Sequence, residues 1–175
     1  PRRLSQRHKT RGIWREYAFS QVQRNVMDLA LGLHQLGIQR GETVAIIGEN
    51  EPQHYWAEFA AQAIGCKVIS LYPDLSADEV QYLLEDSEAV CLFAQDQEQV
   101  DKGLAVKAAT PNLRHIVYWD DTGMWSYHDS ILRKFHQLQS EGRALGEKDA
   151  LLYDRLVDQG CPDDIAVLSY TSGTT

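Results

Sequence analysis

The last six residues of the chain carry the groups best suited to chemistry. They read Tyr-Thr-Ser-Gly-Thr-Thr (170–175), five hydroxyl side chains around one glycine, and they follow an apolar run from Ile165 to Leu168. A glycine lets main-chain N–H groups converge on an anion, and Ser and Thr hydroxyls add further donors. The composition therefore predicts a loop that wraps around phosphate oxygens. The simpler alternative is an ordinary Ser/Thr-rich turn.

Two better-known phosphate motifs do not occur in the sequence. A Walker A loop needs G-x-x-x-x-G-K-[ST], and a dinucleotide fingerprint needs G-x-G-x-x-G. The apolar run Val44–Gly48 resembles the first strand of a nicotinamide- or nucleotide-sugar-binding Rossmann protein, but only one of the three glycines is present. The sequence therefore disfavours that class.

The elements that must position the loop follow from hydrophobic periods that alternate between helix and strand. Apolar residues at three- and four-residue spacing predict a helix that begins at Ser20 and ends at Gly37. Further helices are predicted over 56–64, 76–84 (with a Ser76/Glu79 capping box), 97–109, 127–138 and 151–157. Short apolar runs predict strands over 43–48, 67–72, 89–94, 115–118 and 165–170, and the polar stretch 139–148 predicts a loop.

Strands separated by single helices predict right-handed crossovers and therefore an α/β fold. We expect a mostly parallel, doubly wound sheet with helices on both faces over residues 20–175, preceded by a basic segment over 1–19. Ligands of such sheets bind beyond the carboxyl ends of the strands. The hydroxyl loop follows the carboxyl end of the last predicted strand, so its position agrees with its composition.

Length, charge and cysteine usage narrow the class of protein. A chain of 175 residues supports one sizeable core, and its net charge of −8 argues against a general nucleic-acid binder. No apolar run approaches the length of a membrane-spanning helix. The odd number of cysteines, without metal-ligand spacing, predicts free thiols in a reducing cytoplasm. Cys66 and Cys91 lie in apolar runs and are predicted core residues, whereas Cys161 lies in a loop.

The basic residues are concentrated at the start of the chain. Six arginine or lysine side chains precede the first acid, Glu16. Such a leader could touch anionic lipid, as peripheral membrane contact, or a polyanionic cofactor. The interpretation that we favour from the sequence is a solvated, poorly ordered terminal arm.

Several other polar residues invite a functional role. Asn50 and His54 flank the carboxyl end of the first strand of the sheet, and we expect His54 to lie on the surface at a helix N-terminus. Asp163 and Asp164 could pair at a metal, but Pro162 before them is more typical of a turn. The four tryptophans show no stacking pattern for bases.

The closing loop resembles the opening of the phosphate loop of adenylate-forming enzymes, Y-T-S-G-T-T-G-x-P-K-G. The resemblance extends upstream in order and at compatible spacing. It includes the segments 12–20, 41–50, 63–73 and 76–87, which are similar to those of bacterial long-chain fatty acyl-CoA synthetases. Ser70 departs from the proline that many members carry. The chain ends before the G-x-P-K-G half of the loop.

This resemblance implies an ATP-dependent ligase for long-chain fatty acids. A carboxylate attacks ATP to form an acyl-adenylate and pyrophosphate, and coenzyme A then takes the acyl group. By resemblance the β- and γ-phosphates are held by Thr171, Ser172, Gly173, Thr174 and Thr175. Mg²⁺ is expected, but no carboxylate of this chain is assigned to it and no catalytic residue is expected within the chain.

The parts of such enzymes that complete the reaction follow the phosphate loop, so we expect this stretch alone to be inactive. Two alternatives stay open from the sequence. One keeps the chemistry but changes the carboxylate or the acceptor. The other is a non-catalytic α/β domain that associates with another copy through a sheet edge and apolar faces.

Overall fold

A parallel sheet forms the centre of the protein. The structure, a computed structural model, describes residues 3–171. Five parallel strands pair in the order β4-β3-β5-β6-β7. The strands are β3 (Thr43–Ile47), β4 (Lys67–Leu71), β5 (Ala89–Ala94), β6 (His115–Tyr118) and β7 (Leu132–Lys134). The predicted parallel sheet is therefore confirmed, and the first four of these strands lie where the apolar runs placed them.

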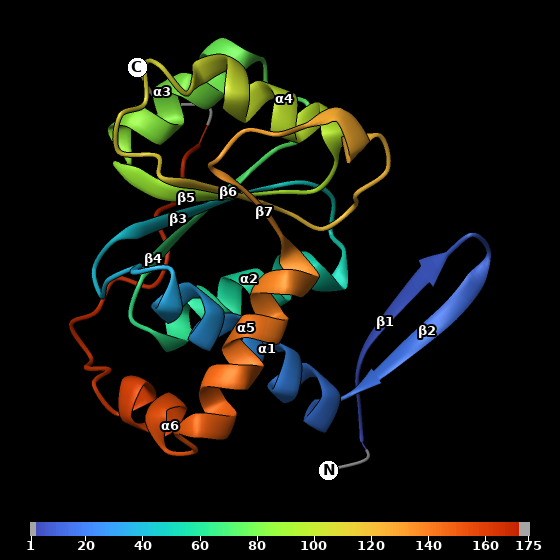
Figure 1. Ribbon diagram of the computed structural model, residues 1–175, viewed down its shortest axis with the longest axis vertical. Coiled ribbons are helices and arrows are strands. Elements are labelled where there is room, and N and C mark those ends of the chain that lie inside the picture. The colour runs from blue at the N-terminus through green and yellow to red at the C-terminus, as the bar shows by residue number, and fades with distance from the viewer. Residues whose placement is uncertain (1–2, 172–175) are drawn as a thin grey trace.

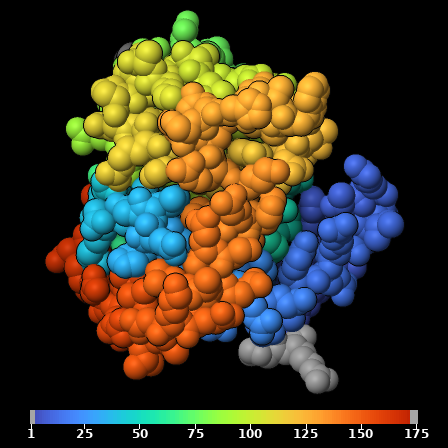
Figure 2. Space-filling view, viewed as in Figure 1, coloured from blue at the N-terminus to red at the C-terminus, as the bar shows by residue number. Residues whose placement is uncertain are grey.

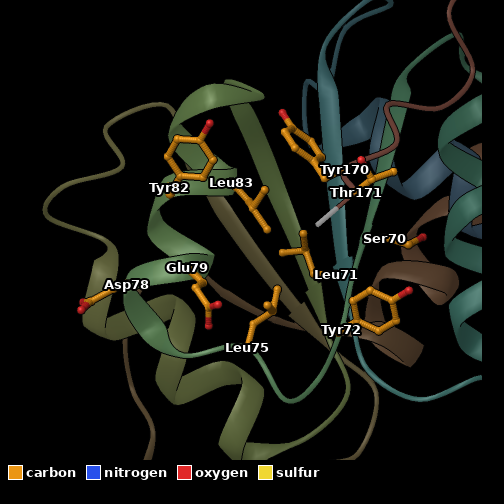
Figure 3. Close-up of a pocket in the computed structure, with 10 residues that line it drawn as sticks. All are labelled: Ser70, Leu71, Tyr72, Leu75, Asp78, Glu79, Tyr82, Leu83, Tyr170 and Thr171. Carbon is orange, nitrogen blue, oxygen red and sulfur yellow. The ribbon is translucent and has the colours of Figure 1, made fainter. Parts of the chain in front are cut away.

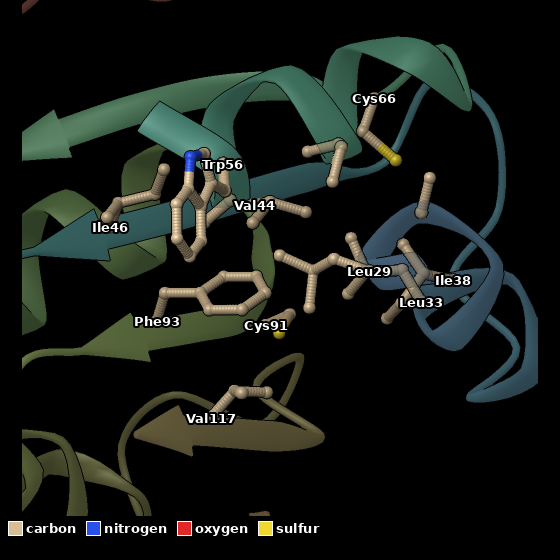
Figure 4. Close-up of a cluster of buried hydrophobic side chains, with 14 of the residues drawn as sticks. Leu29, Leu33, Ile38, Val44, Ile46, Trp56, Cys66, Cys91, Phe93 and Val117 are labelled. Atoms are coloured by element: carbon tan, nitrogen blue, oxygen red, sulfur yellow. The ribbon is translucent and has the colours of Figure 1, made fainter. Parts of the chain in front are cut away.

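Helices cover both faces of this sheet (Figure 1). One face carries α1 (Phe19–Gln35), α2 (Pro52–Ala63) and α5 (Phe135–Lys148), and the other carries α3 (Ala77–Asp86) and α4 (Gln97–Val106). The short helix α6 (Leu152–Val157) lies against α1. Figure 4 shows Trp56 of α2, Leu29 of α1 and Phe93 of β5 in the apolar cluster of the first face. The prediction of a doubly wound α/β fold is confirmed.

Local signals explain where the helices begin and end. The side chain of Ser76 accepts a hydrogen bond from the Glu79 amide at 3.4 Å, and the Glu79 carboxylate accepts one from the Ser76 amide at 2.8 Å. This capping box starts α3 as predicted. Gly37, with φ of +82°, follows α1 in the left-handed conformation that glycine adopts most readily.

The predictions for residues 127–148 are wrong. The expected helix over 127–138 is instead an irregular stretch and β7, and only its last four residues are helical, as the first turn of α5. The expected loop over 139–148 is the rest of α5, which follows a 3-10 turn at Met124–Ser126 and β7. The buried positions of α5 are Phe135, Leu138 and Gly142. Because a glycine occupies the third of these positions, the apolar stripe is too short to indicate a helix from sequence.

The predicted last strand forms only in part. Residues 165–170 join the sheet through a single parallel bridge between Val68 and Val167. The Val68 amide donates to the Ala166 carbonyl at 3.0 Å, and the Leu168 amide donates to the Val68 carbonyl at 2.9 Å. The segment therefore runs along the free edge of β4, in the same direction as the strands.

The N-terminal segment is not a disordered arm, so the favoured interpretation of it was wrong. The strands β1 (Leu4–Thr10) and β2 (Ile13–Ala18) form an antiparallel hairpin beside the main sheet (Figure 1). Trp56 donates its indole N–H to the Gln6 side chain at 2.9 Å, and its ring meets that of Tyr17 edge-on at 5.3 Å. These contacts hold the base of the hairpin against α2.

The three cysteines are free thiols, as predicted. Cys66 and Cys91 are buried, and burial raises the pKa of Cys66 to about 12 and that of Cys91 above its usual range. Cys161 is exposed. Among residues 3–171, no helix is long and apolar enough to cross a membrane.

Candidate active site

Two cavities open at the carboxyl ends of β3 and β4, on either side of the segment that leads into the hydroxyl loop. The first has a volume of about 590 Å³ and is bounded by the ends of both strands, the first turns of α2 and residues 167–170. Its lining is mostly polar and includes the carboxylates of Glu49, Glu58 and Asp74 but, among the described residues, no Lys or Arg. This polar cavity suits hydroxyl or amide groups better than a phosphate.

The second cavity, of about 520 Å³, is mostly apolar. Figure 3 shows Leu83 and Tyr82 of α3 on one side and Tyr170 and Thr171 on the other. Leu71, Tyr72 and Leu75 complete the wall at the end of β4. This cavity was not predicted from the sequence. The sequence did contain a signal for it. Because α3 directly follows β4 in the chain, its exposed face was bound to lie near the carboxyl end of that strand, beside the predicted site.

The structure places the start of the predicted phosphate loop at this edge of the sheet. Thr171 is exposed and lines the apolar cavity. Ser172, Gly173, Thr174 and Thr175 lie outside the described residues, so their assignment to phosphate stays a prediction. The described part of the chain offers the Thr171 hydroxyl as a donor, and a triphosphate would need the remaining donors of the loop as well.

Tyr170 anchors the lead-in segment to α3. Its hydroxyl donates to the Asp86 carboxylate at 2.8 Å. Partial burial and the neighbouring Asp86 carboxylate raise the pKa of Tyr170 to about 12. The phenol therefore stays protonated over the physiological range, which suits an anchoring residue better than an acid or base.

His54 is not on the surface, so the expectation for this residue was wrong. Its side chain is buried at the start of α2, with Nε2 at 3.3 Å from the Ser70 hydroxyl of β4. The other ring nitrogen, Nδ1, has no hydrogen-bond partner among the described residues. Burial lowers the pKa of His54, so the ring is neutral near pH 7. The histidine joins α2 to β4 beneath the polar cavity.

This burial predicts a pH-dependent stability. Because the folded pKa of His54 lies below the unfolded value of 6.5, the unfolded chain takes up this proton first as the pH falls. The contribution of neutral His54 is complete above about pH 7.5 and is lost as the pH drops through 6.5, at up to about 1.4 kcal/mol per pH unit. Urea unfolding at pH 7.5 and 5.5 should show a smaller loss in His54→Gln than in the wild type. An equal loss in both proteins would contradict the assignment.

The position where nucleotides bind in many doubly wound folds is filled in this protein. The order of the strands places the switch point between β3 and β5. Gly48, at the end of β3, has φ of +153°, and a Cβ there would lie 2.9 Å from the Trp119 ring. Trp119 is held by a hydrogen bond from its indole N–H to Glu51 at 2.9 Å. The open cavities therefore lie on the β4 side, which further disfavours the Rossmann alternative.

The paired acids of the sequence lie at the opposite end of the strands from the two cavities. Asp164 accepts a hydrogen bond from the Cys161 amide at 2.9 Å and forms an ion pair with Arg40. Arg40 precedes β3, so this pair lies at the amino end of the strands. Within residues 3–171, no group of three or more His, Cys, Asp or Glu side chains could hold a metal ion. The interpretation of Pro162–Asp164 as a turn is consistent with this geometry.

Several curated proteins are similar to this chain over almost its whole length. FadD15 of Mycobacterium tuberculosis, a long-chain-fatty-acid–CoA ligase, is 29% identical over 164 residues, which cover 94% of this chain and 26% of that protein. ACSBG1 of Homo sapiens, also a long-chain-fatty-acid–CoA ligase, is 27% identical over 168 residues, covering 95% of this chain and 22% of that protein. The chain thus spans about a quarter of the length of these relatives.

Solved structures share the fold. The anthranilate CoA ligase AuaEII, in complex with anthranoyl-AMP, superposes with a TM-score of 0.64 at 23% identity over 72% of this chain and 23% of its own. The A domain of a carboxylic acid reductase from Segniliparus rugosus, in complex with AMP and a carboxylic acid, gives 0.64 at 15% identity over 82% of this chain and 27% of its own. Residues 2–175 also match the family described as AMP-binding enzyme. Because that match covers nearly the whole chain, the protein belongs to the AMP-binding enzyme family.

Proposed function

We propose that this chain is part of an ATP-dependent ligase that joins long-chain fatty acids to coenzyme A. The observation that carries the proposal is the family match over residues 2–175, together with relatives named as long-chain-fatty-acid–CoA ligases over almost the whole chain. These relatives favour a fatty acid over another carboxylate. The free thiols of the chain suit a cytoplasmic location.

In this proposal the segment 165–171 delivers the hydroxyl loop to the edge of the sheet. The main-chain and hydroxyl donors from Thr171 onward would hold the β- and γ-phosphates of ATP, with Mg²⁺ neutralising part of their charge. Donors that are already in place lower the cost of charge that develops as pyrophosphate leaves. Tyr170, held by Asp86 at 2.8 Å, would keep the start of the loop in position.

The direct test compares the 175-residue chain with the full-length product of its gene. Full-length protein, Mg²⁺, ATP and a fatty acid should give exchange of labelled pyrophosphate into ATP, and added coenzyme A should give the thioester. The isolated chain should give no exchange. Lack of exchange by the full-length protein with fatty acids of any chain length would overturn the proposal. Exchange by the isolated chain would overturn its expected inactivity.

Removal of the Thr171 hydroxyl should slow adenylation. We expect Thr171→Ala in the full-length protein to lower kcat for pyrophosphate exchange about tenfold, because one charge-assisted hydrogen bond is lost. Thr122→Ala changes an exposed loop threonine and serves as the matched control. An unchanged rate in Thr171→Ala would remove this residue from the phosphate site without affecting the wider proposal.

A further inference from the structure

The hairpin β1–β2 presents a basic and aromatic outer face. In its register Arg7 faces Glu16 and Lys9 faces Trp14, so these four side chains share one face, and all four residues are exposed. The opposite face carries Gln6 and Tyr17, which contact Trp56 of α2. One face of the hairpin is therefore attached to the body of the protein and the other is free among the described residues.

The free face combines two cations with one aromatic ring. Trp14, on this face, is 54% exposed. Ile13 faces Thr10 and therefore lies on the other face, at the tip of the hairpin, where it is 70% exposed. The Arg7 guanidinium lies 5.0 Å from the centre of the Trp14 ring, and the Lys9 ammonium lies 5.8 Å from it. Tryptophan favours the boundary between water and lipid, where its ring is apolar and its N–H stays hydrated.

The charge of the hairpin is opposite to that of the chain. Residues 4–18 carry Arg7, Lys9, Arg11 and Arg15 against Glu16 alone, whereas the whole chain has a net charge of −8. Figures 1 and 2 show the hairpin standing away from the body. Its strands extend about 20 Å, and charges are screened over about 8 Å at physiological salt. The tip can therefore approach an anionic surface while the acidic body is held at a distance.

We propose that the tip and the outer face of the β1–β2 hairpin dock on an anionic lipid surface, with Ile13 at the tip and Trp14 on the outer face. The basic side chains would lie among the headgroups, and Trp14 and Ile13 would enter the boundary with the acyl chains. A second copy of the protein fits this face less well, because the two hairpins would bring like charges together. Nucleic acid also fits less well, because an exposed isoleucine at the tip gains nothing from phosphate. This inference does not depend on the proposed ligase activity.

Vesicle sedimentation with the 175-residue chain tests the proposal. Vesicles of phosphatidylcholine with 30% phosphatidylserine should pellet the chain, and vesicles of phosphatidylcholine alone should not. Each basic residue near such a surface contributes about fivefold to binding. Lys9→Gln/Arg11→Gln should therefore weaken binding about 30-fold. The matched control, Arg24→Gln/Lys148→Gln, removes two exposed cations elsewhere and should stay within about twofold.

Tryptophan fluorescence gives a second, independent measurement. Anionic vesicles should shift the emission to the blue, and the shift should disappear in Trp14→Ala but persist in Trp125→Ala, which removes a ring that is 84% exposed in the 3-10 turn. Circular dichroism should show that all variants stay folded. Equal binding to neutral vesicles, or unchanged binding of the hairpin variants, would overturn the proposal. The proposal would also be overturned if the hairpin were required for binding to RNA or for dimer formation while the chain did not bind vesicles.

Discussion

Gly142→Ala should lower the free energy of unfolding by about 3 kcal/mol or more. A Cβ at this position in α5 would lie 1.8 Å from the Asp28 carbonyl oxygen and 2.5 Å from the Gly32 amide nitrogen of α1. Both of these atoms belong to the backbone, so no side-chain rotation can relieve the overlap. The two helices would have to separate by more than an ångström.

Separation of the helices would also strain the polar contacts beside the crossing. The Arg143 guanidinium donates to the buried Asp28 carboxylate at 2.7 Å and 3.0 Å. The Gln139 side chain donates to Asn25 at 3.0 Å. A buried carboxylate that loses its cation is strongly destabilising. The loss of stability in Gly142→Ala should therefore exceed the cost of a single steric overlap.

Gly146→Ala is the matched control, because it makes the same change one helical turn later. There a Cβ would meet only the Leu31 Cδ1 atom at 2.9 Å, at the flexible end of a side chain. Alanine also favours helix over glycine by about 1 kcal/mol. We expect Gly146→Ala to stay within about 1 kcal/mol of the wild type in urea unfolding. Equal effects of the two substitutions would mean that the helices do not cross at Gly142.

Gly48→Ala should cost about 3 kcal/mol and disturb the edge of the sheet where the candidate site lies. The φ of +153° at Gly48 is a conformation that other residues rarely adopt. The new Cβ would lie 2.7 Å from Gln95 Cβ and 2.9 Å from two atoms of the Trp119 ring. Gln95 cannot move freely, since its side chain accepts a hydrogen bond from the Glu49 amide at 2.6 Å.

Two comparisons separate the backbone strain of a positive φ from the steric overlap of the new Cβ in Gly48→Ala. Gly37→Ala also places alanine at a positive φ, but no atom lies within 4 Å of its Cβ, so it should cost only about 1 to 2 kcal/mol. A double-mutant cycle with Trp119→Leu should show a favourable coupling of about 1 kcal/mol, because the smaller side chain makes room. Additive effects in that cycle would show that Trp119 does not close the switch point.

Much of the scaffold was predictable from sequence. Strands β3 and β5 are buried on both faces. Each is therefore a continuous apolar run, which can be recognised as a strand without reference to the rest of the chain. The capping box at Ser76 and the glycine at Gly37 mark helix ends through local chemistry alone. The order of the elements then determined the class of fold, and the closing hydroxyl residues indicated the family.

The tertiary structure decided the features that depend on partners distant in the chain. His54 is buried where α2 meets β4, with Ser70 of β4 at 3.3 Å from its ring. The helix α5 forms despite its polar sequence because Gly142 allows close packing on α1. The N-terminal hairpin likewise depends on Trp56, about 50 residues away from Gln6. The periodicity of apolar residues indicates which side of a segment avoids water, but it does not indicate which other segment will pack against that side. For that reason sequence alone determined the α/β scaffold and the family of this protein, whereas only the tertiary structure decided the closed switch point, the two cavities and the free face of the hairpin.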